Sequence, residues 1–464
     1  MWGVKSCGRL LSVLVVLVFA GAQAKDPPRP TSIWEQDTLT GDWGGARTAM
    51  KDKGIDVTLN YINEVFGVLS GGLNRRSSYE GRFEFSVDTD LQKLVGWSGA
   101  STHVTVYNIH NGGNTAAQNA GSIADPSNID AVPTTRLFTA WFQYGATDGP
   151  FSLRVGQLAA DDEFIISPTA GGLVNGTFGW AGILAANIRS GGPAYPLATP
   201  GARVQVKPSD DVTILGAVFS GDPAGRDCFN NPQFCNRDGT TFSFSGGSLW
   251  IGEVQYGINQ GKNAMGRAMG LPGVYKLGAW YATADYADMR YGVNAAGGVV
   301  SLADPTATGP LNRHGNGGVY AVADQMVWRA GERSLNLFAR GGVAPGDRNT
   351  LSYYLDGGAG FKGLLPSRPN DVLTFGVAYE KISSALTGLD QDTLFFGGPP
   401  YPTRNYEVVF ELNYALQLAP WWTLQPDLQY IVHPGGNVPD PADPTNATAV
   451  KDAFIAGIRS TIKF

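Results

Sequence analysis

Apolar and polar residues alternate with a period of two along most of this chain, and this feature restricts its fold more than any other. In "NYEVVFELNYALQL" the even positions from 406 to 418 are all Tyr, Val, Phe or Leu, whereas Glu407, Glu411 and other polar residues occupy odd positions. "GRFEFSVDTDL", "SLNLFARGGVA" and "WTLQPDLQYIVH" are divided in the same way. Each segment therefore predicts a strand with one apolar and one polar face.

About sixteen such segments recur, each near the roughly 10 residues that a tilted membrane-spanning strand needs. They begin near residues 56, 80, 100, 136, 151, 202, 212, 248, 273, 317, 334, 352, 371, 405, 422 and 452. The segments near 100, 202 and 317 are weak, so fourteen and eighteen strands stay open as alternatives. Short connections such as "GER" and "APW" alternate with the long connections 159–201, 222–247, 286–316 and 434–451.

A soluble β-sandwich also has alternating strands, but it rarely needs strands this long. It also has no reason to place Tyr, Trp and Phe at both ends of the apolar face, where aromatic girdles of membrane barrels lie. After the first residues there is no run of 18 apolar residues that predicts a membrane helix. We therefore predict an all-β fold, a closed transmembrane antiparallel β-barrel of about 16 strands.

The first residues predict export. Lys5 and Arg9, the apolar stretch "LLSVLVVLVFAGA" and the small-residue sequence "AQA" have the form of a signal peptide over residues 1–24. Residues 25–54 are predicted to be an N-terminal periplasmic segment, with a short helix from about Gly44 to Lys53 capped by Thr40 or Asp42 and ended by Gly54. Residues 55–464 are predicted to form the barrel.

Charge and cysteine content exclude some classes of partner and site. Without residues 1–24 the chain has 32 basic and 40 acidic residues, a formal net charge of −8, which argues against a nucleic-acid partner. Cys228 and Cys235 are predicted to form a disulfide that closes a surface loop. No histidine lies near them, so no metal site is expected there. We expect no cofactor.

The polar strand faces supply candidate pore residues. Interleaved acids and arginines suit neutral polyhydroxylated solutes, because carboxylates accept hydrogen bonds from hydroxyl groups and guanidinium groups donate to them. Any single member of this set is also consistent with a simple solvated wall. The set comprises Arg82, Glu84, Asp88, Arg154, Arg340, Glu407, Glu411 and Arg459.

The connection 159–201 is the strongest candidate for a loop that narrows the pore. Its Phe, Trp, Ile and Leu side chains would be costly in water, so we expect it to fold into the lumen; a loop packed on itself outside the barrel is the alternative. Its acids, arginine and aromatic rings are suited to a sugar site. The candidates are Asp161, Asp162, Glu163, Phe164, Trp180, Asn187 and Arg189.

Several stretches resemble the OprB-type carbohydrate-selective porins. They are "LTGDWGGARTAMKDKGIDVTLNY", "LFTAWFQY", "LRVGQLAADDEF", "YPLATPGARV" and "LQPDLQYIVHPGG…FIAGIRSTIKF", and the resemblance covers nearly all of residues 34–464. It implies a sixteen-stranded barrel in the outer membrane of a Gram-negative bacterium. Inward-folded loops would form a constriction through which glucose and similar sugars diffuse passively. It also implies that Gln157, Asp161, Glu163 and Phe164 lead into the constriction. The Cys228–Cys235 loop is a departure from the family pattern.

Two other functions have to be distinguished from this one. A general diffusion porin without sugar preference has the same barrel. A barrel enzyme needs a histidine beside a nucleophile or an acid, and none of the four histidines lies in a recognisable motif. His103, with Ser101 and Thr105 on its face, is better explained as a polar patch of the wall. The sequence leaves open whether the chain forms a homo-oligomer.

The segment "IRSTIKF" predicts the last strand, paired with the first. Arg459 and Lys463 are expected to face the lumen, and Phe464 the lipid. An aromatic residue in this place also resembles the signal that barrel-assembly machinery recognises.

Overall fold

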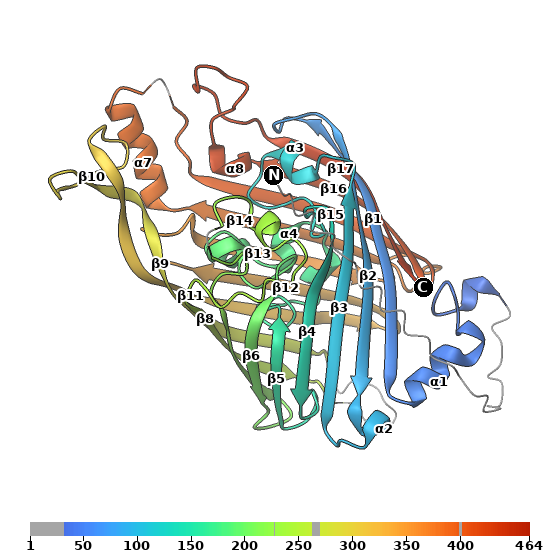
Figure 1. The fold of residues 1–464 in the computed structure, drawn as a ribbon. Helices are drawn as coiled ribbons and strands as arrows, with labels where there is room; N and C mark the ends of the chain where they lie inside the picture. The colour runs from blue at the N-terminus through green and yellow to red at the C-terminus, as the bar shows by residue number, and fades with distance from the viewer. Residues whose placement is uncertain (1–31, 227, 262–269, 399–400) are drawn as a thin grey trace, which may run out of the picture.

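One closed β-sheet forms the body of the protein in the computed structural model (Figure 1). The structure describes residues 32–464 except 227, 262–269 and 399–400, so the predicted signal peptide lies outside the described residues. Each strand of the wall is antiparallel to its neighbours. The first strand, β1 (Ile55–Ser70), pairs with both β2 (Ser77–Asp90) and the last strand, β17 (Ala453–Lys463), which closes the ring. None of the helices in the described ranges is long and apolar enough to span a membrane.

Among the described residues the sheet contains seventeen strands, of which the three-residue β10 pairs only with β9, so sixteen strands make up the closed wall. The sequence predicted a strand within or close to each of these sixteen. The strands are β1 Ile55–Ser70, β2 Ser77–Asp90, β3 Ala100–Asn111, β4 Thr134–Tyr144, β5 Phe151–Leu158, β6 Thr199–Val206, β7 Val212–Ser220, β8 Ser248–Ile258, β9 Gly273–Asn294, β10 Val299–Ser301, β11 Ala307–Ala330, β12 Arg333–Val343, β13 Leu351–Lys362, β14 Val372–Ile382, β15 Tyr406–Ala419, β16 Trp422–Val432 and β17 Ala453–Lys463.

The alternation in the sequence corresponds to the two faces of the wall. In β15 the apolar residues at even positions point outward and Phe410 and Leu412 are exposed there, whereas Glu407 and Glu411 point inward and are buried. In β17 Ile458 is exposed on the outside, and Arg459 points inward, where its Nε lies 2.5 Å from Glu64 Oε2 of β1. The predicted pairing of the last strand with the first is confirmed by a register that runs from Asn60–Lys463 to Ser70–Phe454.

The two rims of the barrel differ, as predicted. At one rim, here called the short-turn rim, most connections are short, such as 331–332 and 420–421; at the other, the long-loop rim, the connections include 112–133, 159–198 and 221–247. The helices are α1 Ala46–Asp52, α2 Leu91–Val95, α3 Ala116–Ala120, α4 Gly176–Gly179, α5 Gly182–Ala185, α6 Pro232–Cys235, α7 Ser384–Phe395 and α8 Pro434–Asn437, with 3₁₀ turns η1 Ile33–Glu35, η2 Trp43–Gly45, η3 Ala170–Gly172 and η4 Arg189–Gly191.

The N-terminal segment lies against the short-turn rim, close to the end of β17 (Figure 1). Its helix α1 begins at Ala46 rather than Gly44, because Gly44 and Gly45 have positive φ angles and form a separate 3₁₀ turn. The Asp42 carboxylate accepts a hydrogen bond from the backbone N–H of Thr48, so Asp42 satisfies one donor of the first helical turn. Gly54, with φ +90°, follows the helix as predicted.

The connection predicted over 286–316 is wrong in its extent. β9 and β11 have 22 and 24 residues and continue as a paired ribbon beyond the rest of the wall at the long-loop rim, where β10 joins them (Figure 1). In "ADYADMRYGVN" both the even and the odd positions contain charged residues, so the segment does not have the apolar face that predicts a lipid-facing strand. A ribbon outside the membrane needs no apolar face.

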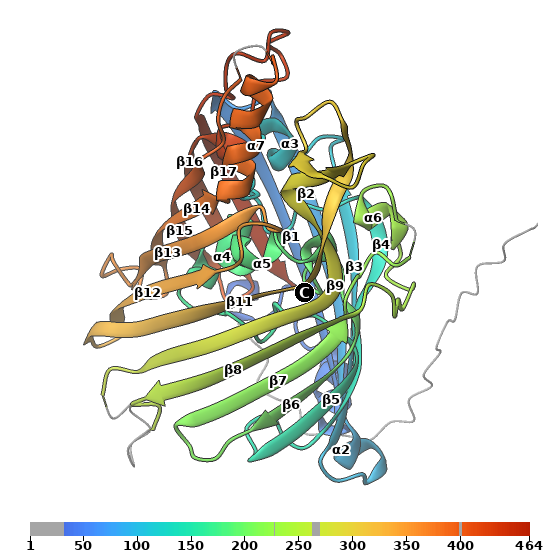
Figure 2. The ribbon, with the colours of Figure 1, turned by 90° about the vertical axis from the view of Figure 1, so that its left-hand side faces the viewer.

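The main hydrophobic cluster lies inside the barrel, between the wall and the loop 159–198. Phe164, Phe178 and Ile183 of the loop are buried against inward wall residues such as Phe338 and Tyr354. The predicted folding of this loop into the lumen is confirmed, and Figure 2 shows α4 and α5 enclosed by the strands.

Candidate functional site

Wall carboxylates anchor the loop 159–198 inside the barrel. Glu253 of β8 accepts a hydrogen bond from the N–H of Ile165 at 2.8 Å, and Asp324 of β11 accepts one from the N–H of Thr169 at 2.8 Å. Glu411 of β15 accepts from Val174 N at 2.6 Å and from Asn175 N at 2.9 Å. The loop leaves the wall after β5 and is therefore fastened to strands that lie far along the sheet.

A second loop, 112–133, also enters the lumen. Glu80 of β2 accepts a hydrogen bond from Ala116 N at 2.7 Å, and Glu407 of β15 accepts from Ile123 N and Ala124 N. The backbones of the two loops are joined as well, for example where Gly176 N donates to Asp125 O at 2.8 Å. The sequence prediction did not single out this loop.

A cavity of about 730 Å³ lies between these loops and strands β1 to β4. Aromatic rings of Tyr107, Phe138, Phe178, Trp180 and Tyr195 line it together with charged side chains from the wall and from both loops. The charged lining residues are Arg82, Asp125, Asp130, Asp161, Asp162, Glu380 and Arg459. Donors, acceptors and flat apolar surfaces thus meet around one space, as binding of a small polar ligand requires.

Arg82 is held in this cavity by two tyrosines. Its guanidinium carbon lies 4.5 Å from the centre of the Tyr107 ring and 5.1 Å from that of Tyr195. Its ion pair within the described chain is a long contact of 3.9 Å with Glu84. Because the arginine is fixed by ring contacts rather than by a close carboxylate, its N–H groups can serve a ligand.

Two adjacent aspartates stand on the loop at the entrance from β5. Asp161 is bound through Oδ2 to the N–H of Tyr195 at 2.9 Å, and burial raises its pKa to about 6. The Asp162 carboxylate faces the lumen and makes no hydrogen bond to the described residues. Protein atoms around the carboxylate reduce its hydration, and this, together with the neighbouring charge of Asp161, raises the pKa of Asp162 to about 7, although the residue is exposed to the lumen.

A stack of side chains continues from the cavity toward the short-turn rim. Arg154 lies 3.9 Å from the centre of the Trp141 ring, and His103 is stacked with Trp141 at 4.9 Å. At one end of the stack, Asp88 Oδ1 lies 2.7 Å from His103 Nδ1; at the other, Glu163 Oε2 lies 3.5 Å from Arg154. The predicted residues Asp88, Arg154 and Glu163 are therefore brought together in one row.

Other predicted residues face inward but contact protein instead of the lumen. Arg340 is fully buried, where it pairs with Asp356 and donates hydrogen bonds to Ile165 O and Thr177 O of the loop. Glu407 and Glu411 are buried as loop anchors, as described above. Phe164 lies in the hydrophobic cluster. The alternation predicts the face on which a residue lies, but it does not reveal that a loop covers this face.

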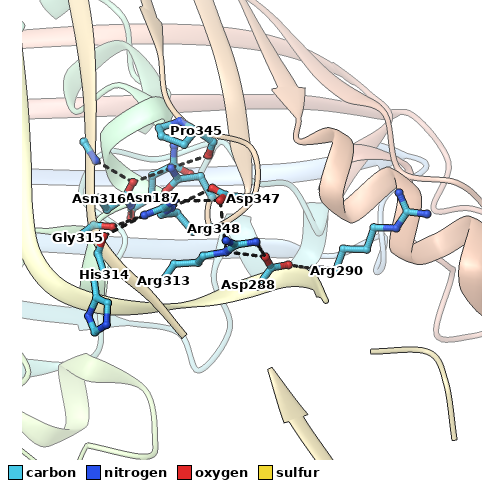
Figure 3. A network of polar contacts seen from close by, with 12 residues as sticks. Asn187, Asp288, Arg290, Arg313, His314, Gly315, Asn316, Pro345, Asp347 and Arg348 are labelled. Atoms are coloured by element: carbon cyan, nitrogen blue, oxygen red, sulfur yellow. Dashed lines mark hydrogen bonds and ion pairs between the residues drawn. The ribbon is translucent and has the colours of Figure 1, made fainter. Parts of the chain in front are cut away.

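Asn187 and Arg189 lie nearer the long-loop rim. Asn187 accepts from Leu351 N and donates to Leu351 O, and the Arg189 guanidinium bonds to Asp285 O of β9. Figure 3 shows Asn187 beside a charged network at the foot of the β9–β11 ribbon, in which Arg313 and Arg348 both pair with Asp347. These contacts connect the end of the loop to the ribbon.

Several cavity residues were missed by the sequence prediction. Tyr107 and Phe138 lie on predicted strands, but nothing in an alternating strand distinguishes a ring that lines a cavity from one that fills a core. Asp125, Asp130 and Tyr195 come from loops whose path the sequence does not show. Acidic and aromatic residues within a long connection are the one signal that could have indicated them.

The predicted Cys228–Cys235 disulfide is present, next to α6 in the connection between β7 and β8. In the part of the chain that the structure describes, no three His, Cys, Asp or Glu side chains are arranged to hold a metal ion.

Comparison with known proteins gives concordant results. The model of the family "Carbohydrate-selective porin, OprB family" matches residues 74–464. The chain is 27% identical to Porin B of Pseudomonas aeruginosa over 98% of this chain and 96% of that protein. It is 24% identical to Putative porin QuiX of Acinetobacter baylyi over 97% and 98% of the two chains. The high-pH structure of Pseudomonas putida OprB matches with a TM-score of 0.79 and 26% identity, over 93% of this chain and 99% of that one.

Proposed function

The chain belongs to the carbohydrate-selective porin family OprB, and on this premise we propose where and how it selects sugars. It is a sugar-selective porin of the Gram-negative outer membrane. By the usual orientation of such barrels, the short-turn rim faces the periplasm and the long-loop rim faces outside. We place residues 25–54 on the periplasmic side and the porin domain in residues 55–464.

The cavity between the two inward loops is the selective region in this proposal. Arg82 donates hydrogen bonds to ring and hydroxyl oxygens of a hexose such as glucose, and Asp162 accepts from its hydroxyl groups. The rings of Tyr107, Tyr195 and Trp180 contact its C–H faces. One observation carries the proposal. Arg82 of β2, which is held by two tyrosine rings, and Asp162 of the loop 159–198, whose carboxylate is open to the lumen, line the same cavity.

Passage is passive in this scheme. The cavity contacts replace part of the sugar's hydration, but no single contact is strong enough to retain it. The row of Asp88, Trp141 and Arg154 extends the same combination of polar groups and rings toward the periplasm. A sugar leaving the cavity would meet these groups next.

Two partners complete the proposal. Phe464, with an aromatic contact to Phe83 at 6.2 Å between ring centres, is assigned as the residue that barrel-assembly machinery recognises. The outward face of the wall contacts lipid. A measurement of the mass of the purified protein would determine whether several copies associate.

Sugar titration of single channels tests the proposal. Ion current through the protein in planar bilayers should fall as glucose or a short glucose oligomer is added, and liposomes should swell faster with a neutral hexose than with a charged solute of similar size. Ion conductance that no sugar reduces, together with equal swelling for all solutes of one size, would leave a general diffusion porin as the function.

A further inference from the structure

The entry of the loop 159–198 into the lumen leaves a gap in the barrel wall. β5 ends at Leu158, and β4 pairs with β5 only between Ala140 and Tyr144. The outer half of β4, residues 134–139, therefore has no strand beside it on the β5 side. An exposed strand edge at this depth would leave backbone groups unpaired.

Residues 228–239, here called the wall patch, lie along this edge. Leu137 N of β4 donates to Asp238 O at 3.0 Å, and Val132 N donates to Gln233 Oε1 at 2.7 Å. Gly239 approaches so closely that a Cβ there would lie 1.9 Å from Leu137 O, so the contact requires glycine. The Cys228–Cys235 disulfide closes the part of the patch that contains α6.

Two side chains fasten the wall patch from the barrel side. Arg136 is fully buried and donates to Arg237 O at 3.0 Å and to Gln233 O at 3.3 Å, both in the patch. Gln157, at the end of β5, donates from Nε2 to Gly239 O at 2.9 Å. Each guanidinium nitrogen of Arg136 and the amide nitrogen of Gln157 donates to backbone carbonyl groups, which offsets the cost of burying these groups.

The same two side chains reach the aromatic wall of the cavity. Arg136 donates to Pro196 O at 2.9 Å, next to Tyr195, and Gln157 donates to Phe138 O at 2.8 Å. Tyr107, Phe138 and Tyr195 form one aromatic cluster with ring centres 5.0 to 6.1 Å apart. This cluster holds Arg82, as described above. A continuous set of contacts thus joins the disulfide-closed patch to the proposed sugar site.

We propose that the wall patch is a positioning element for sugar selection, with Arg136 and Gln157 transmitting its position to the rings around Arg82. The inference rests on the proposed function. The patch itself lines no part of the cavity, so its effect on sugar binding is indirect. If the wall patch only closed the gap in the wall, its disruption would increase ion leakage and leave sugar binding unchanged.

The test compares the wild type with the double variant Cys228→Ser/Cys235→Ser and with refolded wild type treated with a reducing agent that cleaves the disulfide. Phe229→Ala is the matched control, because Phe229 lies in the same loop, is 90% exposed and makes no contact that the proposal uses. Two quantities are measured: the glucose-oligomer concentration that halves the single-channel current, and the temperature at which the folded barrel changes mobility on a denaturing gel.

We expect the half-blocking sugar concentration to rise roughly three- to tenfold in the double variant and in reduced wild type, about the effect of losing one hydrogen bond. The gel transition should hardly move, since the sixteen paired strands are intact, and Phe229→Ala should match wild type. Gln157→Leu should produce a similar rise, and combining it with the cysteine variant should add little, because both break one set of contacts.

An unchanged half-blocking concentration after reduction overturns the inference, and so does full additivity of Gln157→Leu with the cysteine variant. If the double variant does not fold, the half-blocking concentration of folded and then reduced wild type decides whether the inference stands. Absence of any sugar block in unreduced wild type is a different result, because it overturns the proposed function itself.

Discussion

Arg82 shows how a charge can be held in place without a close ion pair. Tyr107 and Tyr195 fix its guanidinium plane, while the closest carboxylate, Glu84, is 3.9 Å away. A tight ion pair would occupy the donors that a sugar needs, so ring contacts suit a transient site better.

Replacing this arginine should weaken sugar block while the pore stays open. For Arg82→Ala we expect the half-blocking sugar concentration to rise about ten- to a hundredfold, since hydrogen bonds from a charged donor contribute roughly 1.5–3 kcal/mol. The half-blocking concentration is measured by titrating the single-channel current with sugar. Arg75→Ala, at an exposed arginine of the 71–76 turn, serves as control and should behave as wild type. Equal sugar block in both variants would contradict the assignment of Arg82.

The raised pKa of Asp162 predicts a pH-dependent selectivity near neutrality. With a pKa of about 7, the carboxyl group is mostly neutral at pH 5 and mostly charged at pH 8.5, so cation preference should increase as the pH rises. Reversal potentials in a salt gradient measure this preference. Asp162→Asn should remove most of the change, and a variant with the same pH profile as wild type would show that other groups cause it.

At the scale of elements, the polar face of the wall holds loops as well as water. Seven inward carboxylates, from six strands spread around the barrel, accept hydrogen bonds from the two inward loops: Glu64, Glu80, Glu253, Asp324, Glu380, Glu407 and Glu411. A buried carboxylate that accepts two backbone N–H groups is satisfied without a cation. Alternating acids in a barrel sequence can therefore indicate anchored loops.

Removing one anchor should loosen the narrow region without unfolding the wall. Glu411→Ala leaves Val174 N and Asn175 N without their acceptor, at a cost of about 1–3 kcal/mol for each buried donor. We expect larger and noisier single-channel conductance and weaker sugar block, with the gel mobility transition of the barrel retained. Glu411→Gln keeps one acceptor oxygen, so its conductance and its sugar block should lie between those of the wild type and those of Glu411→Ala. Unchanged conductance in Glu411→Ala would mean that the loop does not limit the current.

The N-terminal segment forms a clasp with the end of β17 at the short-turn rim. Arg47 donates to Phe464 O at 2.6 Å, Leu39 N donates to Lys463 O at 2.7 Å, and Trp34 stacks on Trp421 with ring centres 6.0 Å apart. These contacts protect the seam between β1 and β17, where the wall closes.

Breaking the clasp should lower the thermal stability of the folded barrel. For Arg47→Ala we expect the gel mobility transition to move down by several degrees, as loss of a charged hydrogen bond of roughly 1.5–3 kcal/mol implies. Lys51→Ala removes an exposed ion pair with Asp56 from the same helix and should change little. Equal transitions in the two variants would show that the segment rests on the rim without stabilising it.

At the scale of the whole molecule, the sequence predicts the wall far better than the pore. A period of two is a local property, so the strand beginning near 406 and the outward face of Phe410 follow from neighbouring residues alone. The cavity depends on contacts between distant segments: Tyr195 meets Arg82, and Glu411 meets Val174, only through the folded path of a loop. Composition indicated that the loop 159–198 enters the lumen, but not which wall residues it covers, and so Arg340 was expected to line the pore rather than to be buried.

The long-range anchors have a consequence for the order of events during assembly. Val174 and its acceptor Glu411 are 237 positions apart, and Ala124 and Glu407 are 283 apart. The chain is made from its N-terminus, so both loops exist long before β15 supplies their acceptors. Neither loop can therefore reach all of its anchors until β15 has taken its place in the wall, and the narrow region is completed only when almost the whole chain is present.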